Sequence, residues 1–116
     1  MPDIEDCLRQ VMAIRGALGV SLIDYPSGLT MATAGRGPVA ADSTLRLARA
    51  TLDTAAFATV GRPSQVEDVA ITAENGYHLL HFPGGRMVLQ VWLDRTTGNL
   101  AIMQRSLHTI GARLAA

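Results

Sequence analysis

The sequence predicts an α+β domain in which helices cover both faces of a five-stranded antiparallel sheet. Helical and strand-like segments follow one another in the order α-β-β-α-β-β-β-α along 116 residues, a length that suits a single domain spanning 1–116. Turn-forming residues between neighbouring strands favour hairpins, and therefore antiparallel pairing. Strands such as Met87–Leu93 are apolar on both faces, so each face of the sheet needs a cover. A three-layer sandwich satisfies all three observations.

The two terminal helices each carry one apolar stripe. The first is expected at Asp3–Arg15, with Asp3 as N-cap and Gly16 ending it in the left-handed conformation. The last is expected from about Thr97 to Leu114. The residues that recur at helical spacing are Ile4, Cys7, Leu8, Val11 and Ile14 in the first helix and Leu100, Met103, Leu107, Ile110 and Leu114 in the last.

Five strands are expected from runs of apolar and β-branched residues that turn-forming residues separate. Pro26 to Gly28 and Pro83 to Gly85 are expected to form turns, and Asn75-Gly76 is a typical tight-turn pair. The expected strands are Ala17–Tyr25, Leu29–Ala34, Val66–Thr72, Tyr77–Phe82 and Met87–Leu93.

The central helix is expected to begin at Asp42 and to continue to about Val60, where Gly61 and Pro63 stop it. It has two apolar faces, and only one of them can lie on the sheet. The sheet-facing set is Leu45, Ala48, Leu52, Ala55, Ala56 and Thr59; the opposite set is Leu47, Ala50, Thr54, Phe57 and Ala58. A narrow polar strip of Arg46, Arg49 and Asp53 separates the two sets. The second apolar face predicts contact with another chain, because exposed apolar patches tend to mark interaction sites.

Composition excludes several classes of function. Ten basic residues balance ten acidic ones, so the basic excess that is typical of nucleic-acid binding is missing. The 48% hydrophobic and 17% charged content predicts a packed globular protein. Neither a leader sequence nor an apolar run of about 20 residues is visible, so we expect a cytoplasmic protein with no membrane insertion. All basic residues are arginine, a bias that is typical of a GC-rich bacterial genome.

We expect no catalytic, cofactor-binding or metal-binding residues. The run from Gly35 to Pro38 lacks the ending of a phosphate-binding loop. His78 and His81 should point to opposite faces of their strand, and His108 should lie on the polar side of the last helix, so each is interpreted as structural. Glu67 and Asp68 are interpreted as charges at a strand edge, and Cys7 is interpreted as a buried apolar residue.

Three stretches together resemble the Roadblock/LC7 family, especially its short actinobacterial members: Gly16–Gly35, Val66–Leu80 and Val88–Leu107. They cover most of the chain in the order typical of that family, with small departures at Pro26 and Gly98. The resemblance implies a sheet with the central helix on one face and the terminal helices on the other. It also implies a homodimer in which the third strands pair edge to edge and the central helices lie side by side.

The resemblance further implies a non-enzymatic, homodimeric adaptor or regulator of a small Ras-like GTPase. Two alternatives stay open: a signalling-complex scaffold that leaves the nucleotide cycle unchanged, and a small-ligand sensor. The residues expected at the dimer interface are Leu47, Ala50, Thr54, Phe57, Val69 and Ile71. The residues expected to contact the GTPase are Arg46, Arg49 and Asp53.

Overall fold

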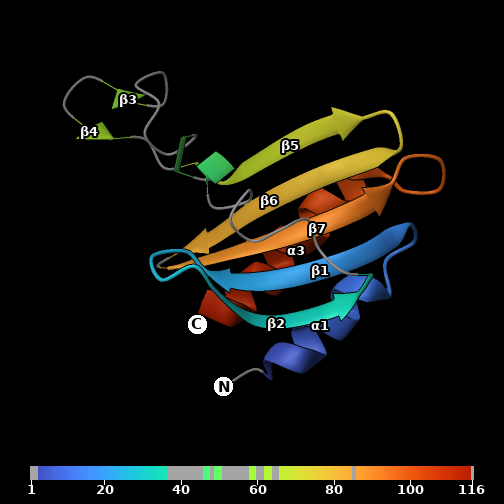
Figure 1. The fold of residues 1–116 in the computed structure, drawn as a ribbon, viewed down its shortest axis with the longest axis horizontal. Coiled ribbons are helices and arrows are strands. Elements are labelled where there is room, and N and C mark those ends of the chain that lie inside the picture. Colours follow the sequence, from blue (N-terminus) through green and yellow to red (C-terminus); the bar gives the residue numbers. More distant parts are fainter. Residues whose placement is uncertain are drawn as a thin grey trace.

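The computed structural model describes residues 3–36, 46–47, 49–50, 58–59, 62–63, 66–84 and 86–115 (Figure 1). Within these ranges lie two full helices, a central sheet and a separate pair of two-residue strands. The elements are α1 (Ile4–Met12), β1 (Ala17–Asp24), β2 (Leu29–Gly35), β3 (Ala58–Thr59), β4 (Arg62–Pro63), β5 (Asp68–Ala73), β6 (Gly76–Gly84), β7 (Met87–Asp94) and α3 (Leu100–Ala115).

The central sheet has five strands in the order β2-β1-β7-β6-β5, and every neighbouring pair is antiparallel. Hairpins join β1 to β2, β5 to β6 and β6 to β7. The pairing of β1 with β7 closes the sheet between two chain segments that are far apart in sequence. The predicted five-stranded antiparallel sheet and the α+β class are therefore confirmed, with β2 and β5 at the two edges.

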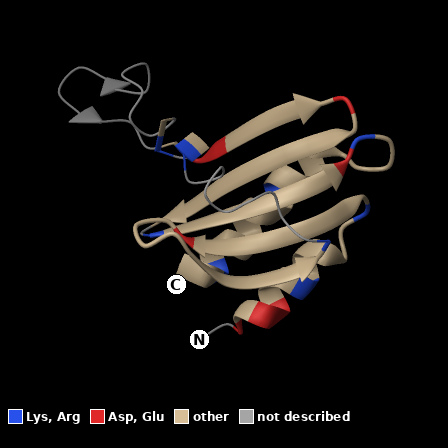
Figure 2. Cartoon of the chain, viewed as in Figure 1, with Lys and Arg blue, Asp and Glu red and all other residues tan. Residues whose placement is uncertain are grey.

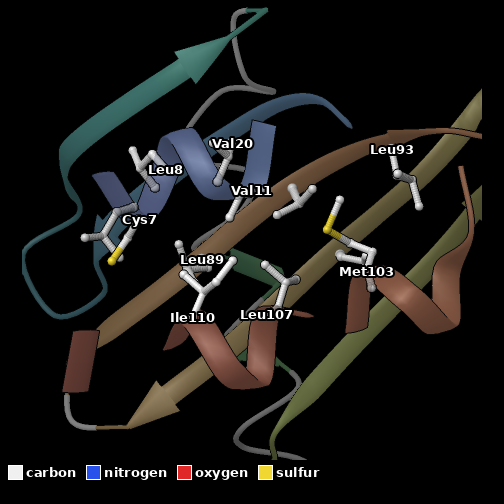
Figure 3. Close-up of a cluster of buried hydrophobic side chains, with 12 residues drawn as sticks. Cys7, Leu8, Val11, Val20, Leu89, Leu93, Met103, Leu107 and Ile110 are labelled. Carbon is white, nitrogen blue, oxygen red and sulfur yellow. The ribbon is translucent and has the colours of Figure 1, made fainter. Parts of the chain in front are cut away.

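Helices α1 and α3 pack side by side against one face of the sheet (Figures 1 and 3). Their apolar stripes meet alternate residues of the strands, because successive strand residues point to opposite faces. Cys7, which is fully buried, lies in this core as predicted. The buried members of the cluster are Cys7, Leu8, Val11, Val20, Leu22, Leu79, Leu89, Val91, Leu93, Met103, Leu107 and Ile110.

Helix α1 begins as predicted and ends earlier than predicted. The side chain of Asp3 accepts a hydrogen bond from the backbone N–H of Glu5 at 3.0 Å, as an N-cap does. The helix stops at Met12, and Gly16 then turns the chain into β1 with φ of 90°. A side chain at Gly16 would place its Cβ 2.5 Å from the Cα of Gly98, so this crossing requires glycine for space as well as for conformation.

The opposite face of the sheet carries a smaller apolar cluster. Leu80 and Val88 are buried there, and partly buried Tyr25, Leu47, Val69 and Phe82 pack against them. Leu47 was expected on the face of the central helix that turns away from the sheet, and this expectation is wrong. The side chain of Leu47 packs instead against Leu80 and Val88 of the sheet.

The central segment also differs from the prediction at its end. Residues 46–47 and 49–50 are helical, but Ala58 and Thr59 form β3 and pair with β4 at Arg62 and Pro63. The prediction that the central helix continues to Val60 is therefore wrong, and the order of elements contains an additional pair of short strands, β3 and β4. Pro63 lies in β4, and proline is disfavoured inside a helix because it lacks the backbone N–H.

The part of the chain that the structure describes contains no helix with the length and apolar character needed to cross a bilayer.

Candidate functional site

Strand β5 forms one open edge of the sheet, and its middle carries no charge. Between Asp68 at its start and Glu74 in the following turn lie only Val69 to Ala73. Figure 2 shows this strand without charged residues except at its ends. Natural edge strands are commonly protected by charges, proline or bulges, because an unprotected edge pairs readily with another strand. The edge of β5 therefore has the character of a pairing surface.

The outward-facing backbone groups of β5 follow from its pairing with β6. The backbone N–H of Phe82 donates to the carbonyl of Glu67 at 2.9 Å, which makes this a hydrogen-bonded pair of the ladder. Such pairs alternate along an antiparallel ladder, so Val69 and Ile71 bond toward β6. The N–H and C=O groups of Ala70 and Thr72 consequently point away from β6, toward the open edge.

The predicted interface residues lie in different environments. Ile71 is 38% exposed, and Ala50 is also exposed, whereas Val69 and Leu47 are half-buried in the cluster with Leu80 and Val88. Residues 46–47 and 49–50 lie beside the start of β5 (Figure 1), so the described members of the predicted set occupy one region of the molecule. Thr54 and Phe57 lie outside the described residues.

The predicted partner-binding residues are described only in part. Arg46 and Arg49 are both exposed on the helical turn next to the start of β5. Asp53 lies outside the described residues. Two arginines and the acidic pair Glu67 and Asp68 therefore place charge of both signs near one end of the edge strand (Figure 2).

A second arrangement near this edge joins one carboxylate to two imidazoles. Nδ1 of His81 donates to Oδ1 of Asp68 at 2.7 Å, and Nε2 of His108 donates to Oδ2 of the same side chain at 2.6 Å. The two imidazole rings are 4.6 Å apart between centroids and tilted by 53°. Asp68 begins β5, His81 lies on β6 and His108 lies on α3, so three elements meet at this Asp68–His81–His108 cluster.

The three side chains of the cluster differ in their exposure to solvent. The side chain of His81 is 4% exposed, that of Asp68 21% and that of His108 42%. Space for the ring of His81 depends on Gly111 of α3, where an added Cβ would lie 2.6 Å from Nε2. A buried ring with a carboxylate on one side and a tightly packed helix on the other has little freedom to rotate.

The charges around His108 favour its protonated form. The hydrogen bond to Asp68 raises the pKa of His108 above its usual value of 6.5, burial lowers it somewhat, and the negative charges of Asp68 and Glu67 raise it further. The carboxylate and this imidazole therefore attract each other more strongly as the imidazole gains a proton.

The sequence did not predict that Asp68, His81 and His108 come together. His78 and His81 do point to opposite faces, and His78 stacks on Trp92 with ring centroids 6.0 Å apart. Asp68, interpreted as an edge charge, instead points to the helix-covered face and meets His81, its cross-strand neighbour. A two-residue turn at Asn75-Gly76 would pair Glu74 with Tyr77 and place Asp68 opposite Pro83, whereas the observed register pairs Asp68 with His81.

The Asn75-Gly76 prediction itself holds for the hairpin but not for the turn residues. Glu74 and Asn75 form the turn, and Gly76 already pairs with Ala73 as the first residue of β6. Gly76 is required by a close approach, because a Cβ there would lie 2.8 Å from Nε1 of Trp92.

A small polar hollow lies on the face of the sheet that α1 and α3 leave open. Its volume is about 10 Å³, and it is lined by Ser21, Arg36, His78, Gln90 and Trp92, among others. Among the residues that the structure describes, buried Oε1 of Gln90 accepts no hydrogen bond and buried Nε1 of Trp92 donates none. A hollow of this size suits one water molecule, so it offers no support for the small-ligand alternative.

Comparison with solved structures identifies the architecture. A Roadblock/LC7 domain from Streptomyces avermitilis is similar, with a TM-score of 0.76 at 16% identity over 98% of this chain and 96% of that chain. The chain has the Roadblock/LC7 fold. The resemblance to the Roadblock/LC7 family is thus confirmed at the level of the fold. Helices α1 and α3 share one face of the sheet, as that resemblance implied.

Two further solved structures have the same arrangement. MglC from Myxococcus xanthus is similar with a TM-score of 0.67 at 18% identity, over 95% of this chain and 94% of that chain. MglB, in a structure described as having a tetrameric arrangement, is similar with a TM-score of 0.76 at 18% identity, over 96% of this chain and 84% of that chain. No protein-family model matches the sequence, and no curated protein matches it.

Proposed function

We propose that this chain is a non-enzymatic adaptor that forms a homodimer and binds a small Ras-like GTPase. The observation that carries the proposal is the uncharged open edge of β5, whose outward N–H and C=O groups at Ala70 and Thr72 suit strand pairing. The Roadblock/LC7 fold adds support, because the resemblance to that family implies both dimers and GTPase partners, and one similar solved structure is a tetrameric arrangement of MglB.

In the proposed dimer, the β5 strands of two copies pair antiparallel and join their sheets. Exposed Ile71 would be covered by the second copy, together with the neighbouring helical turn that contains Ala50. Thr54 and Phe57 belong to the same proposed interface by sequence. The proposal predicts a mass of about twice the 12.3 kDa of one chain by light scattering.

Ala70 provides the sharpest test of edge pairing, because its N–H faces outward. Ala70→Pro removes this donor without removing a hydrogen bond to β6, so the monomer should fold while the dimer weakens. Ala70→Val keeps the N–H and is the matched control, with an unchanged dimer. A fully dimeric Ala70→Pro variant would refute β5 pairing.

The two sheet edges can be distinguished by a second pair of variants. Ile71 on β5 and Met31 on β2 are both exposed apolar residues on edge strands, at 38% and 49%. Ile71→Glu should dissociate the dimer because it places charges of the same sign opposite each other near the two-fold axis. Met31→Glu should leave the dimer intact, and the reverse result would move the interface to β2.

The GTPase part of the proposal assigns the partner surface to Arg46, Arg49 and Asp53, next to the dimer edge. Calorimetry and co-elution with a small Ras-like GTPase from the same organism, loaded with GDP or with a GTP analogue, test it directly. Arg49→Glu should weaken binding by about tenfold or more, since charged contacts at the centre of an interface contribute about 2 kcal/mol. Binding in neither nucleotide state would refute this part.

The signalling-scaffold alternative is separated by the same experiment. Firm binding that leaves GTP hydrolysis and nucleotide exchange unchanged would favour a passive scaffold. A changed rate of either step would favour a regulator.

A further inference from the structure

We propose that Asp68, His81 and His108 bind a divalent transition-metal ion of the zinc type. The three residues offer one carboxylate oxygen and two imidazole nitrogens, and the ligand atoms all lie within 4.8 Å of one another. Two imidazoles and a carboxylate are a ligand set that Zn²⁺ accepts, with one further position left for water.

The distances require only a local adjustment of side chains. Ligand atoms around a tetrahedral Zn²⁺ lie about 3.4 Å apart, as follows from bond lengths of about 2.0–2.2 Å. The contacts of Asp68 with His81 and His108, at 2.7 and 2.6 Å, are shorter than this because a proton lies between each pair. A small rotation of the Asp68 side chain and of partly exposed His108 would open this space, while buried His81 stays fixed.

Proton positions change when the ion binds. The ring of His81 must present Nδ1 as a lone pair and carry its proton on Nε2, and the ring of His108 must present Nε2 and carry its proton on Nδ1. The ion then takes the place of the two N–H protons whose hydrogen bonds Asp68 accepts in the metal-free protein. Each of these protons moves to the other nitrogen of a neutral ring or is released to solvent from a protonated ring. The negative charge of Asp68, which contacts both rings, favours a cation at this position.

A bound ion would affect the stability of the fold because the three ligands lie on different elements. Asp68 lies at the start of the edge strand, His81 on its neighbour and His108 on α3, 40 positions from Asp68. A bound ion would therefore cross-link the edge strand to the helix behind it. Metal binding should raise the unfolding temperature, because the unfolded chain does not hold the three ligands together.

The binding test uses the full chain without an affinity tag, after treatment with a chelator. Titration with Zn²⁺ in a calorimeter should give one ion per chain and a higher unfolding temperature, and titration with Mg²⁺ should give neither, because Mg²⁺ prefers oxygen ligands. His108→Ala and Asp68→Asn should each weaken Zn²⁺ binding by at least tenfold. His78→Ala removes a histidine from the opposite face and should bind as the unaltered protein does.

A measurement on the unaltered protein keeps the test independent of variants. Paramagnetic Ni²⁺ should broaden the ring signals of His81 and His108 in NMR spectra at less than one equivalent, while the ring signals of His78 stay sharp. Absence of Zn²⁺ binding to the unaltered protein would overturn the proposal. Binding that survives both His108→Ala and Asp68→Asn, or broadening confined to other residues, would also overturn it. None of these results depends on dimerisation or on a GTPase.

Discussion

Oδ2 of Asp68 lies 2.6 Å from Nε2 of His108, although 40 positions of sequence separate the two residues. The other oxygen of the same carboxylate contacts His81. One side chain at the start of the edge strand is therefore tied both to the neighbouring strand and to α3. The contact matters for function because the same edge strand carries the proposed dimer interface.

The contact between Asp68 and His108 predicts a pH dependence of the metal-free protein. The hydrogen bond to Asp68 raises the pKa of His108 in the folded state, and the unfolded chain should have a value of about 6.5. The stabilisation is then fully present below pH of about 6.5 and is lost as pH rises through the higher folded-state pKa. NMR titration of the histidine rings in the presence of a chelator, together with urea unfolding across this range, measures both quantities.

Asp68→Asn is the informative variant for this titration. It removes the charge while keeping a similar shape, so the pKa of His108 should fall toward its usual value. His78, whose ring stacks on Trp92 on the other face of the sheet, supplies the internal reference signal. A pKa of His108 at or below about 6.5 in the unaltered protein would contradict the assignment.

The hairpins could be predicted from local sequence because a turn joins the two strands of each, whereas no turn joins β1 to β7. Leu29 follows the predicted turn at Pro26 to Gly28 and pairs with Asp24. The central segment could not be predicted as well. Alanine, threonine and leucine at several spacings give two apolar faces, so periodicity alone does not decide that Leu47 contacts the sheet or that Ala58 lies in a strand.

The Asp68–His81–His108 cluster could not be predicted from sequence for a different reason. The predicted turn at Asn75-Gly76 gives a register in which Asp68 does not face His81, and the position of His108 depends on how α3 crosses the sheet. That crossing is fixed by close contacts such as the one between Gly111 and His81, which have no local pattern in the sequence.

The hydrogen bonds of Asp94 predict a loss of stability at acidic pH. Its Oδ2 accepts hydrogen bonds from the backbone N–H of Thr96 and from the N–H and hydroxyl of Thr97, which shape the turn from β7 to α3. The bonds from Thr97 lower the pKa of Asp94 below 3.8. The stabilisation is therefore present above that value and is lost as pH falls through the lower folded-state pKa. Urea unfolding at about pH 6 and about pH 3 should show a smaller loss of stability for Asp94→Asn than for the unaltered protein.

The corresponding control is Glu74, an exposed acid in the turn between β5 and β6. Glu74→Gln should leave the acid sensitivity of the protein unchanged. An equal pH dependence of the Asp94→Asn variant and the unaltered protein would show that this carboxylate does not contribute.

The core beneath α3 predicts a contrast between two residues of that helix. Leu107 is 1% exposed among α1, α3 and the sheet, whereas Ile102 is 56% exposed (Figure 3 labels Leu107). Leu107→Ala should lower the free energy of unfolding by about 2–5 kcal/mol, because it removes apolar burial and leaves a cavity. Ile102→Ala should change it by less than about 0.5 kcal/mol in urea unfolding. Equal effects would mean that α3 presents a different face to the sheet.

Replacing Gly111 with alanine should change the stability of the protein in the direction opposite to the one that helix propensity alone predicts. Replacing an interior helical glycine with alanine ordinarily stabilises a helix by about 1 kcal/mol. At Gly111 the new Cβ would lie 2.6 Å from Nε2 of His81 and 3.1 Å from Cβ of Pro83. Gly111→Ala should therefore destabilise the protein, by about 1–3 kcal/mol, because tightly packed His81 cannot move away without losing its bond to Asp68.

Ala112→Gly, at the exposed neighbouring position, should show the ordinary propensity effect and destabilise by about 0.5–1 kcal/mol. Unfolding in urea measures both variants, and a more stable Gly111→Ala protein would show that α3 lies farther from His81 than this packing requires.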